Sequence, residues 1–435
     1  MDSFTPIAKT TLDTQALVFE DESDFRVHGS VYTDEQIFNA EMRDIFGKCW
    51  IFIGHESEVR NSGDFKTSFI GRRPVVMSRD EHGEIHVFFN RCRHRGSVVC
   101  REEQGSVKRF QCQYHGWVYG LDGTLQGVAK HKGGYPDDLD KSRLGLMAVP
   151  RVEIYRGLVF ANMDANAITF TAYLGAAKPF LDIHLDRAPD GEVEVVHGAH
   201  RTEYRGNWKF QAENSTDGYH GDTVHESFFK LVAEFGNKSG QHGAYTQGDL
   251  DEIFAHRMTG RTLGFENGHG IWESPLSPDA ADNMRAGPFA DYVDWLEGKY
   301  GTQSMHEMLN AMNLLIFPSL AVLHGQFRVI RPISVDRTEV AMHFFKLKGA
   351  SEAYNNFRLS GYQRFFGPAS FGSPDDVEIF AFNQTGLQAE EVEWLLLSRG
   401  MAREKSNKLG VRVAESTDET PQRAFHRAWR AHMGA

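Results

Sequence analysis

The chain of 435 residues is 41% hydrophobic and 24% charged, a globular composition with length enough for two or three domains. Its formal net charge of −12 argues against nucleic acid as the main partner, because phosphate binding requires a basic face. Four cysteines are too few for a disulfide scaffold, and neither an apolar leader nor a long apolar run occurs, so we expect a reduced, cytoplasmic protein without a membrane segment.

The first third of the chain changes from helical to β-rich character near Cys49. Residues 1–32 are polar and irregular, and Thr33-Asp34-Glu35 then opens an amphipathic pattern that predicts a helix to about Gly47. Short β-rich runs follow, among them WIFIGH, RPVVMSRD and IHVFFN, with turn-forming residues such as Gly83 between them. These runs predict a compact antiparallel β domain over residues 47–165.

The remainder mixes helices and strands, so the whole chain is expected to have an α+β fold. Strand patterns cover residues 193–206, 314–324 and 327–347. Helical patterns cover residues 173–185, 291–299, 302–313 and 377 to about 406, and a short cationic amphipathic helix at 421–435 is expected to pack on the body of the protein.

Two loops of the predicted β domain each carry one cysteine and one histidine. Cys92 and His94, then Cys112 and His115, follow the pattern C-x-H-x17-C-x2-H. A zinc finger pairs cysteine with cysteine and histidine with histidine, whereas here each half contributes one of each. That alternation suits a two-iron cluster in which two thiolates hold one iron and two imidazoles hold the other. A zinc site or four unrelated residues are the alternatives.

A second cluster of polar residues follows the segment Asn207–Trp208. Asp217, His220 and His225 have the spacing D-x2-H-x4-H, and two imidazoles with one carboxylate and open positions are typical of non-haem Fe(II). On a regular helix His220 and His225 lie about 140° apart. Both can reach one metal only if the helix is distorted or ends between them, for which Gly221 offers a place. The alternative is ordinary surface polarity.

The chain resembles the catalytic alpha subunit of Rieske non-haem iron aromatic-ring-hydroxylating oxygenases in three stretches. These are CRHRG from Cys92, CQYHGW from Cys112 and the NW…EN…D-x2-H-x4-H segment. The resemblance runs from about Phe46 to the C-terminus. It implies a Rieske [2Fe-2S] domain at 47–165, and a catalytic domain at 1–46 and 166–435 with a curved antiparallel sheet flanked by helices (helix-grip type).

The resemblance also implies ligand sets. Cys92 and Cys112 would hold one iron of the cluster, and His94 and His115 the other. His220 and His225 would bind a mononuclear Fe(II) together with a downstream aspartate, for which Asp376 is expected and Asp375 is the fallback. The alternative for Ser373-Pro374-Asp375-Asp376 is that it caps the helix that follows.

Asp217 corresponds to the aspartate that joins the two metal centres in this family. It would hydrogen-bond His220 and, across a subunit boundary, His115 of a neighbouring chain. If electrons pass from the cluster of one chain to the iron of the next, the chains must assemble head to tail into a closed ring. The family forms trimers, with or without a small second subunit (α3β3 or α3).

Catalytic and pocket positions of the family fall on Asn214, Ser215, Gly221 and Gly372. Most of these are small, which implies room for a ring substituent. Arg328 occupies the position of an arginine that binds aromatic carboxylates, while Arg331, three residues on, should point to the other face of a strand. The substrate class implied is therefore a benzoate, salicylate, cumate or terephthalate. The alternative is that Arg328 pairs with an acidic neighbour.

The activity implied is cis-dihydroxylation, or monohydroxylation, of an aromatic ring by O2. Electrons would come from NAD(P)H through a flavin and iron–sulfur reductase or a ferredoxin. Three other hypotheses stand beside this one: a Rieske monooxygenase that hydroxylates or demethylates its substrate, a simple Rieske electron carrier, and a zinc-binding structural protein. The length of the chain and residues 207–225 argue against a carrier.

Overall fold

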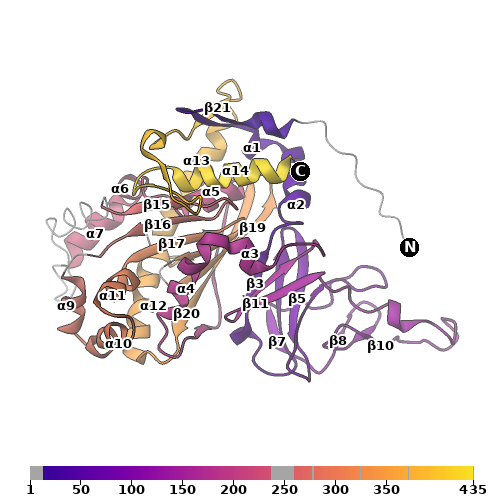
Figure 1. Ribbon diagram of the computed structural model, residues 1–435. Helices are drawn as coiled ribbons and strands as arrows, with labels where there is room; N and C mark the ends of the chain where they lie inside the picture. The colour runs from indigo at the N-terminus through magenta and orange to yellow at the C-terminus, as the bar shows by residue number, and fades with distance from the viewer. Residues whose placement is uncertain (1–12, 237–258, 277–278, 324, 371, 435) are drawn as a thin grey trace.

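The computed structural model describes residues 13–236, 259–276, 279–323, 325–370 and 372–434 (Figure 1). A small β-rich part and a larger part with a long sheet and helices lie side by side, which confirms the expected α+β fold. One hydrophobic core runs through the larger part and into the nearer strands of the smaller one. A second, separate core surrounds Cys92, Cys112 and Trp117 at the far end of the β-rich part.

The β-rich part contains three antiparallel sheets, with strand orders β6-β5-β4-β7, β11-β12-β3 and β10-β9-β8. Its longer strands are buried in part, and the four consecutive residues Val75 to Ser78 of β5 are all buried, as in a strand covered on both faces. Its strands are β3 (Ile51–His55), β4 (Asp64–Ile70), β5 (Arg73–Arg79), β6 (Ile85–Phe89), β7 (Gln104–Ser106), β8 (Phe110–Gln111), β9 (Val118–Tyr119), β10 (Leu125–Gly127), β11 (Arg151–Tyr155) and β12 (Leu158–Asn162).

The larger part is built on one antiparallel sheet with the order β13-β20-β19-β18-β17-β16-β15-β23-β22, in which β14 also pairs with β20. Its central strands are buried along most of their length. The strands are β13 (Val193–Val195), β14 (His200–Tyr204), β15 (Arg261–Gly264), β16 (Gly270–Ser274), β17 (Ala311–Ile316), β18 (Leu320–Leu323), β19 (Gln326–Ser334), β20 (Arg337–Leu347), β22 (Lys405–Ser406) and β23 (Arg412–Glu415).

Helices cover this sheet: α5 contacts β19, α12 contacts β20, α13 contacts β14, and α14 lies on β15 and β16. In Figure 1 the yellow helix α14 crosses above the sheet. The helices are α1 (Ser30–Thr33), α2 (Glu35–Asp44), α3 (Phe170–Leu174), α4 (Lys178–Asp186), α5 (Trp208–Asn214), α6 (Gly221–Val224), α7 (Glu226–Gly236), α9 (Ala280–Arg285), α10 (Ala290–Tyr300), α11 (Thr302–Leu309), α12 (Glu352–Phe366), α13 (Gly372–Gly386) and α14 (Thr420–Met433).

The predicted helix after residue 377 is wrong in its second half. Helix α13 ends at Gly386, and the chain then forms β21 (Trp394–Leu396), which completes a small sheet with β1 (Val18–Glu20) and β2 (Phe25–His28). Because β21 pairs with β2, in which Arg26 is the partner of Leu396, no local pattern could predict it. The helix expected at 302–313 likewise ends at Leu309, before β17 begins.

Helix α5 is fixed to both ends of the chain by a buried charge pair. The Lys209 ammonium lies 2.6 Å from the Glu41 carboxylate of α2, and neither side chain is exposed. The indole N–H groups of Trp208 and Trp429 donate to the same carboxylate over 2.8 and 2.7 Å. A buried ion pair is tolerated only when such hydrogen bonds satisfy its remaining atoms, so this network sets the position of α5 relative to α2 and α14.

Strand β19 presents different residues to its two sides. Phe327 packs against Phe52 and stacks on His55, both in the β-rich part. Arg328, the next residue, points to the side that α5 and α12 cover. One face of β19 therefore packs against the β-rich part, and the other face lines the space beneath the helices.

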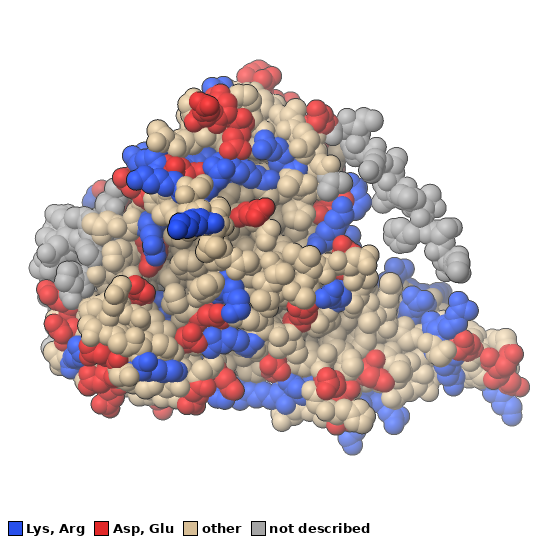
Figure 2. All heavy atoms as spheres, viewed as in Figure 1, with Lys and Arg blue, Asp and Glu red and all other residues tan. Residues whose placement is uncertain are grey.

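Both signs of charge are interspersed over the face drawn in Figure 2, and no extended basic stripe crosses it. None of the described helices is long and apolar enough to cross a membrane.

Candidate functional site

Two loops beside β8 have matching backbone geometry. In each, the N–H of a glycine donates to the carbonyl of the cysteine four residues earlier, over 3.1 Å from Gly96 to Cys92 and 2.9 Å from Gly116 to Cys112. The two glycines have φ of 74° and 68°, a conformation that glycine adopts without strain. Each loop therefore folds back beneath its own cysteine and presents that side chain to the other loop.

The side chains of these loops form a pair of thiols beside a pair of imidazoles. Cys92 and Cys112 are buried, and burial raises the pKa of Cys92, with the neighbouring Cys112 thiol adding to the rise. The ring centroids of His94 and His115 are 4.5 Å apart. Nδ1 of His94 is buried without a hydrogen-bond partner in the described chain. This donor set fits a Rieske [2Fe-2S] cluster.

The second group of polar side chains comes from the ends of three helices. Helix α5 ends at Asn214, and His220 and His225 immediately precede and follow the single turn of α6. The residues between the histidines, Gly221 included, thus form one helical turn, and this turn ends at His225, whose backbone is not helical. The end of the helix lies at the second histidine and not at Gly221, and it lets both side chains reach one position. Asp376 joins them from the first turn of α13.

His220, His225 and Asp376 each bring one donor atom to within 4.8 Å of the others. Oδ1 of Asp376 lies 3.5 Å from Nε2 of His220 and 3.4 Å from Nε2 of His225. Burial raises the pKa of Asp376 to about 6, although His220 and Arg328 act in the opposite direction. Two imidazoles and one buried carboxylate beside an open pocket fit a non-haem Fe(II) ion.

The adjacent carboxylate, Asp375, is turned elsewhere. It accepts a hydrogen bond from the hydroxyl of Ser227 over 3.2 Å. The structure therefore brings Asp376, and not Asp375, to the two histidines. Both lie within α13, which begins at Gly372, so neither is the residue that precedes the helix.

Asp217 lies behind His220, away from Asp376. Its Oδ2 is 3.2 Å from Nδ1 of His220, and its Oδ1 accepts from the N–H of Tyr219 over 2.6 Å. Burial acts to raise the pKa of Asp217, but the hydrogen bond and charge of His220 and the backbone N–H groups hold it below the usual value. A carboxylate on Nδ1 fixes the ring orientation and directs Nε2 toward Asp376.

A pocket opens above the three donor atoms. Asn214 stands at its base, with Nδ2 3.1 Å from both Nε2 of His220 and Oδ1 of Asp376. The lining comprises Asn214, Asp217, Gly218, His220, Gly221, Asp222, His225, Trp272, Asn313, Leu323, Arg328, Phe365, Phe366, Asp376 and Ser416.

Three of the five predicted substrate residues, Asn214, Gly221 and Arg328, line this pocket. The other two are not part of the lining. The Ser215 hydroxyl donates to the carbonyl of Gln211 over 2.7 Å, and Gly372 packs against Phe365 so closely that a Cβ there would meet its ring at 2.8 Å. Gly372 therefore acts through the position of Phe365, which does line the pocket.

Arg328 is a buried cation in the pocket wall. It is 2% exposed, and its Nε and Nη2 have no hydrogen-bond partner in the described chain. Its guanidinium lies 4.9 Å from the ring centroid of Phe366. Burial lowers the pKa of Arg328, against the charges of Asp376 and Tyr362. No described acidic side chain forms an ion pair with it, so the expected alternative of an acidic neighbour is not what the structure contains.

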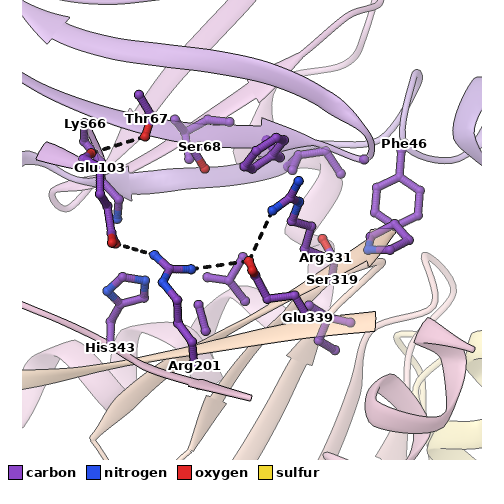
Figure 3. A pocket seen from close by; sticks show the side chains of 18 of the residues that line it. Phe46, Lys66, Thr67, Ser68, Glu103, Arg201, Ser319, Arg331, Glu339 and His343 are labelled. Carbon is purple, nitrogen blue, oxygen red and sulfur yellow. Dashed lines mark hydrogen bonds and ion pairs between the residues drawn. The ribbon is translucent and has the colours of Figure 1, made fainter. Parts of the chain in front are cut away.

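Arg331 faces the other side of β19, as strand geometry predicts. It lines a separate pocket between the sheet and the β-rich part (Figure 3). Its guanidinium lies 3.2 Å from the ring centroid of Phe69. Its Nη1 is 3.4 Å from Glu339, which also pairs with Arg201. Arg201 in turn contacts Glu103 of the β-rich part. Arg331 thus belongs to the contact between the two parts.

The sequence did not point to the residues that hold Asn214 in place. The preceding Glu213 accepts from the Tyr32 hydroxyl over 2.7 Å, and Nε2 of His426 lies 3.0 Å away. These partners come from opposite ends of the chain, so no spacing links them. Trp272 and Asn313 of the pocket were also missed, although strand alternation around residue 313 carried a weak signal.

Comparison with known proteins matches residues 49–143 to the Rieske [2Fe-2S] domain and residues 192–435 to the catalytic domain of ring-hydroxylating alpha subunits. The chain is 36% identical over 384 residues to the large subunit of 2-halobenzoate 1,2-dioxygenase from Burkholderia cepacia, covering 86% of this chain and 80% of that one. It is 35% identical over 388 residues to the large subunit of anthranilate 1,2-dioxygenase from Acinetobacter baylyi, with the same coverage.

A solved structure of naphthalene 1,2-dioxygenase with indole bound in the active site superposes with a TM-score of 0.83 at 28% identity, over 96% of this chain and 94% of that one. Residues 49–143 and 192–435 thus match two domains, and the solved structure covers both of them.

Proposed function

Since this chain belongs to the ring-hydroxylating alpha-subunit family of Rieske oxygenases, we propose that its pocket selects an aromatic carboxylic acid. The protein is the oxygenase component of a ring-hydroxylating dioxygenase and works with separate electron-transfer proteins. When bound, the Rieske cluster supplies single electrons and the mononuclear iron supplies the place where O2 reacts with the ring.

Arg328 carries the proposal about the substrate. A guanidinium with two unpaired N–H donors in a buried pocket wall is costly to leave without an acceptor. A planar carboxylate accepts two parallel hydrogen bonds from such a group and neutralises its charge. Arg328 would therefore hold the acid group at the wall and orient the ring above the base of the pocket, where Asn214 and the iron-binding side chains lie. The relatives act on 2-halobenzoate and anthranilate, which are also aromatic acids.

The individual ligand roles are part of the same proposal. Cys92 and Cys112 hold one iron of the cluster, and His94 and His115 hold the other. The mononuclear iron is bound by two histidines and one aspartate: His220, His225 and Asp376. The proposal includes the domain boundaries: the Rieske domain comprises residues 47–165, and the catalytic domain comprises residues 1–46 and 166–435.

Asp217 is proposed to connect the two centres across a subunit boundary. The loops beside β8 and helix α6 lie at opposite sides of the molecule in Figure 1, which supports a circuit completed by a second chain. The chain would then assemble head to tail into a trimer, with or without a small second subunit. His115 of one protomer would face Asp217 of the next. NAD(P)H is proposed as the ultimate electron source.

The substrate proposal is tested by the affinity of the iron-loaded protein for benzoate and for benzamide, its uncharged analogue. Arg328→Met is expected to raise the Kd of benzoate by about 100-fold, because a charge-assisted bidentate contact is lost. The Kd of benzamide should change little. Arg331→Met, on the opposite face of the same strand, is the matched control. Equal losses for both ligands, or an unchanged Kd for benzoate, would contradict the role of Arg328.

A further inference from the structure

The pocket side of the sheet carries two amide side chains besides Arg328. Gln326 stands two residues before Arg328 on β19, so both point to the same face. Gln326 pairs with Leu323 of β18, and Leu323 pairs with Asn313 of β17. Paired residues in an antiparallel sheet share a face, so Asn313, Leu323 and Gln326 form one row across three strands. Asn313 and Leu323 both line the pocket.

Several amide atoms of this row lack hydrogen-bond partners among the described residues. Both Oε1 and Nε2 of Gln326, which is 0% exposed, have no hydrogen-bond partner in the described chain. The same holds for the buried Oδ1 of Asn313. Buried polar atoms are almost always paired, and leaving several unpaired in one row of a sheet is unfavourable. Asn313 lines the pocket itself, and Gln326 belongs to the same row without being part of the lining. Such atoms offer hydrogen bonds to a ligand that reaches the row.

We propose that Gln326 and Asn313 form a second polar subsite that takes an uncharged hydrogen-bonding substituent, a hydroxyl or an amine, on the ring of the acid. This inference rests on the proposed function and narrows its substrate class. The carboxylate binds Arg328, and the ring substituent binds the amide row. The Cα atoms of Gln326 and Arg328 are about 7 Å apart along the strand, far enough for two groups on one ring to be bound separately.

The chemistry of the row excludes other substituents. A methyl group or a halogen on the ring would leave the amides unpaired in a dry environment. A second carboxylate would need a second buried cation, and an amide row does not provide one. Hydroxyl and amino groups both donate a hydrogen bond to the oxygen of Asn313 or Gln326, and a hydroxyl also accepts one from the Gln326 amide nitrogen.

The test compares ligands of equal size that differ only in hydrogen bonding. Kd values are measured for the iron-loaded protein with hydroxy-, amino- and methylbenzoates substituted at ring positions 2, 3 and 4. At one position at least, the hydroxyl or amino compound should bind about tenfold more tightly than the methyl compound. Methyl compounds that bind as well as the polar ones at all three positions would overturn the proposal.

Variants then locate the subsite. Gln326→Met and Asn313→Leu are close in size to the native residues, and each should reduce the ratio of methyl to hydroxyl Kd toward one if its amide contributes. A ratio that survives in both variants, each with a wild-type melting temperature, would also overturn the proposal. If a variant fails to fold, the ratio of methyl to hydroxyl Kd in the wild-type protein still tests whether the pocket prefers a hydrogen-bonding substituent. Failure of the carboxylate proposal is a different observation, equal binding of benzoate and benzamide.

Discussion

Nδ1 of His220 lies 3.2 Å from Oδ2 of Asp217, three residues earlier in the turn between α5 and α6. The carboxylate thus holds the imidazole from behind while Nε2 faces Asp376, 3.5 Å away. A residue in that position can set the orientation of a ligand without binding the ion itself.

Asp217→Asn should keep the iron and the cluster and lose turnover. The amide oxygen still accepts a hydrogen bond from His220, so the ring keeps its place, but the negative charge proposed to connect His220 to the neighbouring chain is gone. Replacing a carboxylate that supports a ligand histidine lowers activity by about 10- to 100-fold. Metal content, visible absorbance and product formation are measured together. Wild-type turnover would remove the bridging role.

The two neighbouring aspartates of α13 provide a matched pair. Asp376→Ala should abolish binding of the mononuclear iron, because one of its three donor side chains is deleted, while the cluster spectrum remains. Asp375→Ala should retain that iron, since this carboxylate contacts Ser227 instead. Iron analysis of the two variants in parallel decides which aspartate is the ligand, and the reverse result would reverse the assignment.

Cys112→Ala should abolish the visible absorbance of the cluster, because a Rieske cluster requires both thiolates on one iron. Cys100→Ala is the control. Cys100 is also buried, and burial raises the pKa of its thiol to about 12, so it remains a neutral thiol outside the ligand loops. A variant without Cys112 that kept its absorbance would exclude this cysteine as a ligand.

His269 should make the protein less stable in acid. Its Nε2 lies 2.8 Å from the carbonyl of Tyr173, and its Nδ1 accepts from the N–H of Phe317 over 3.0 Å. Burial lowers the pKa of His269 to about 4, from an ordinary 6.5. The folded state therefore binds fewer protons than the unfolded state between these values. The stability is complete above pH 6.5 and falls as the pH drops toward 4, by about 2 kcal/mol at pH 5.

The measurement for His269 is the free energy of unfolding at about pH 7.5 and at about pH 5. In His269→Gln, whose amide can replace both hydrogen bonds, the difference between the two pH values should shrink by about that amount. His82→Gln, at an exposed histidine in the turn after β5, should leave it unchanged. If the free energy of unfolding depends on pH equally in wild type and in His269→Gln, His269 is not a source of the instability in acid.

The sequence by itself determined which residue types carry the chemistry. The two Cys–His loops and the D-x2-H-x4-H segment are short, and each obtains its geometry from nearby backbone, such as the glycines that fold the loops and the turn at Gly221. For the same reason the antiparallel β domain, the α+β fold and part of the long sheet (β13, β14 and β17 to β20) were predictable, because alternation and turn residues act over a few positions. The strands β15, β16, β22 and β23 were not predicted.

Only the tertiary structure decided what depends on distant partners. Asp376 joins His220 and His225 from 151 residues beyond the second of them, and the choice over Asp375 follows from how α13 lies against α6. The anchoring of α5 through Glu41 and Trp429, the strand β21 in place of a predicted helix, and the absence of an acidic partner for Arg328 among the described residues are likewise invisible in local patterns. Each results from packing between segments far apart in the chain, and the burial that such packing imposes leaves Arg328 in the pocket wall without an ion-pair partner in the part of the chain that the structure describes.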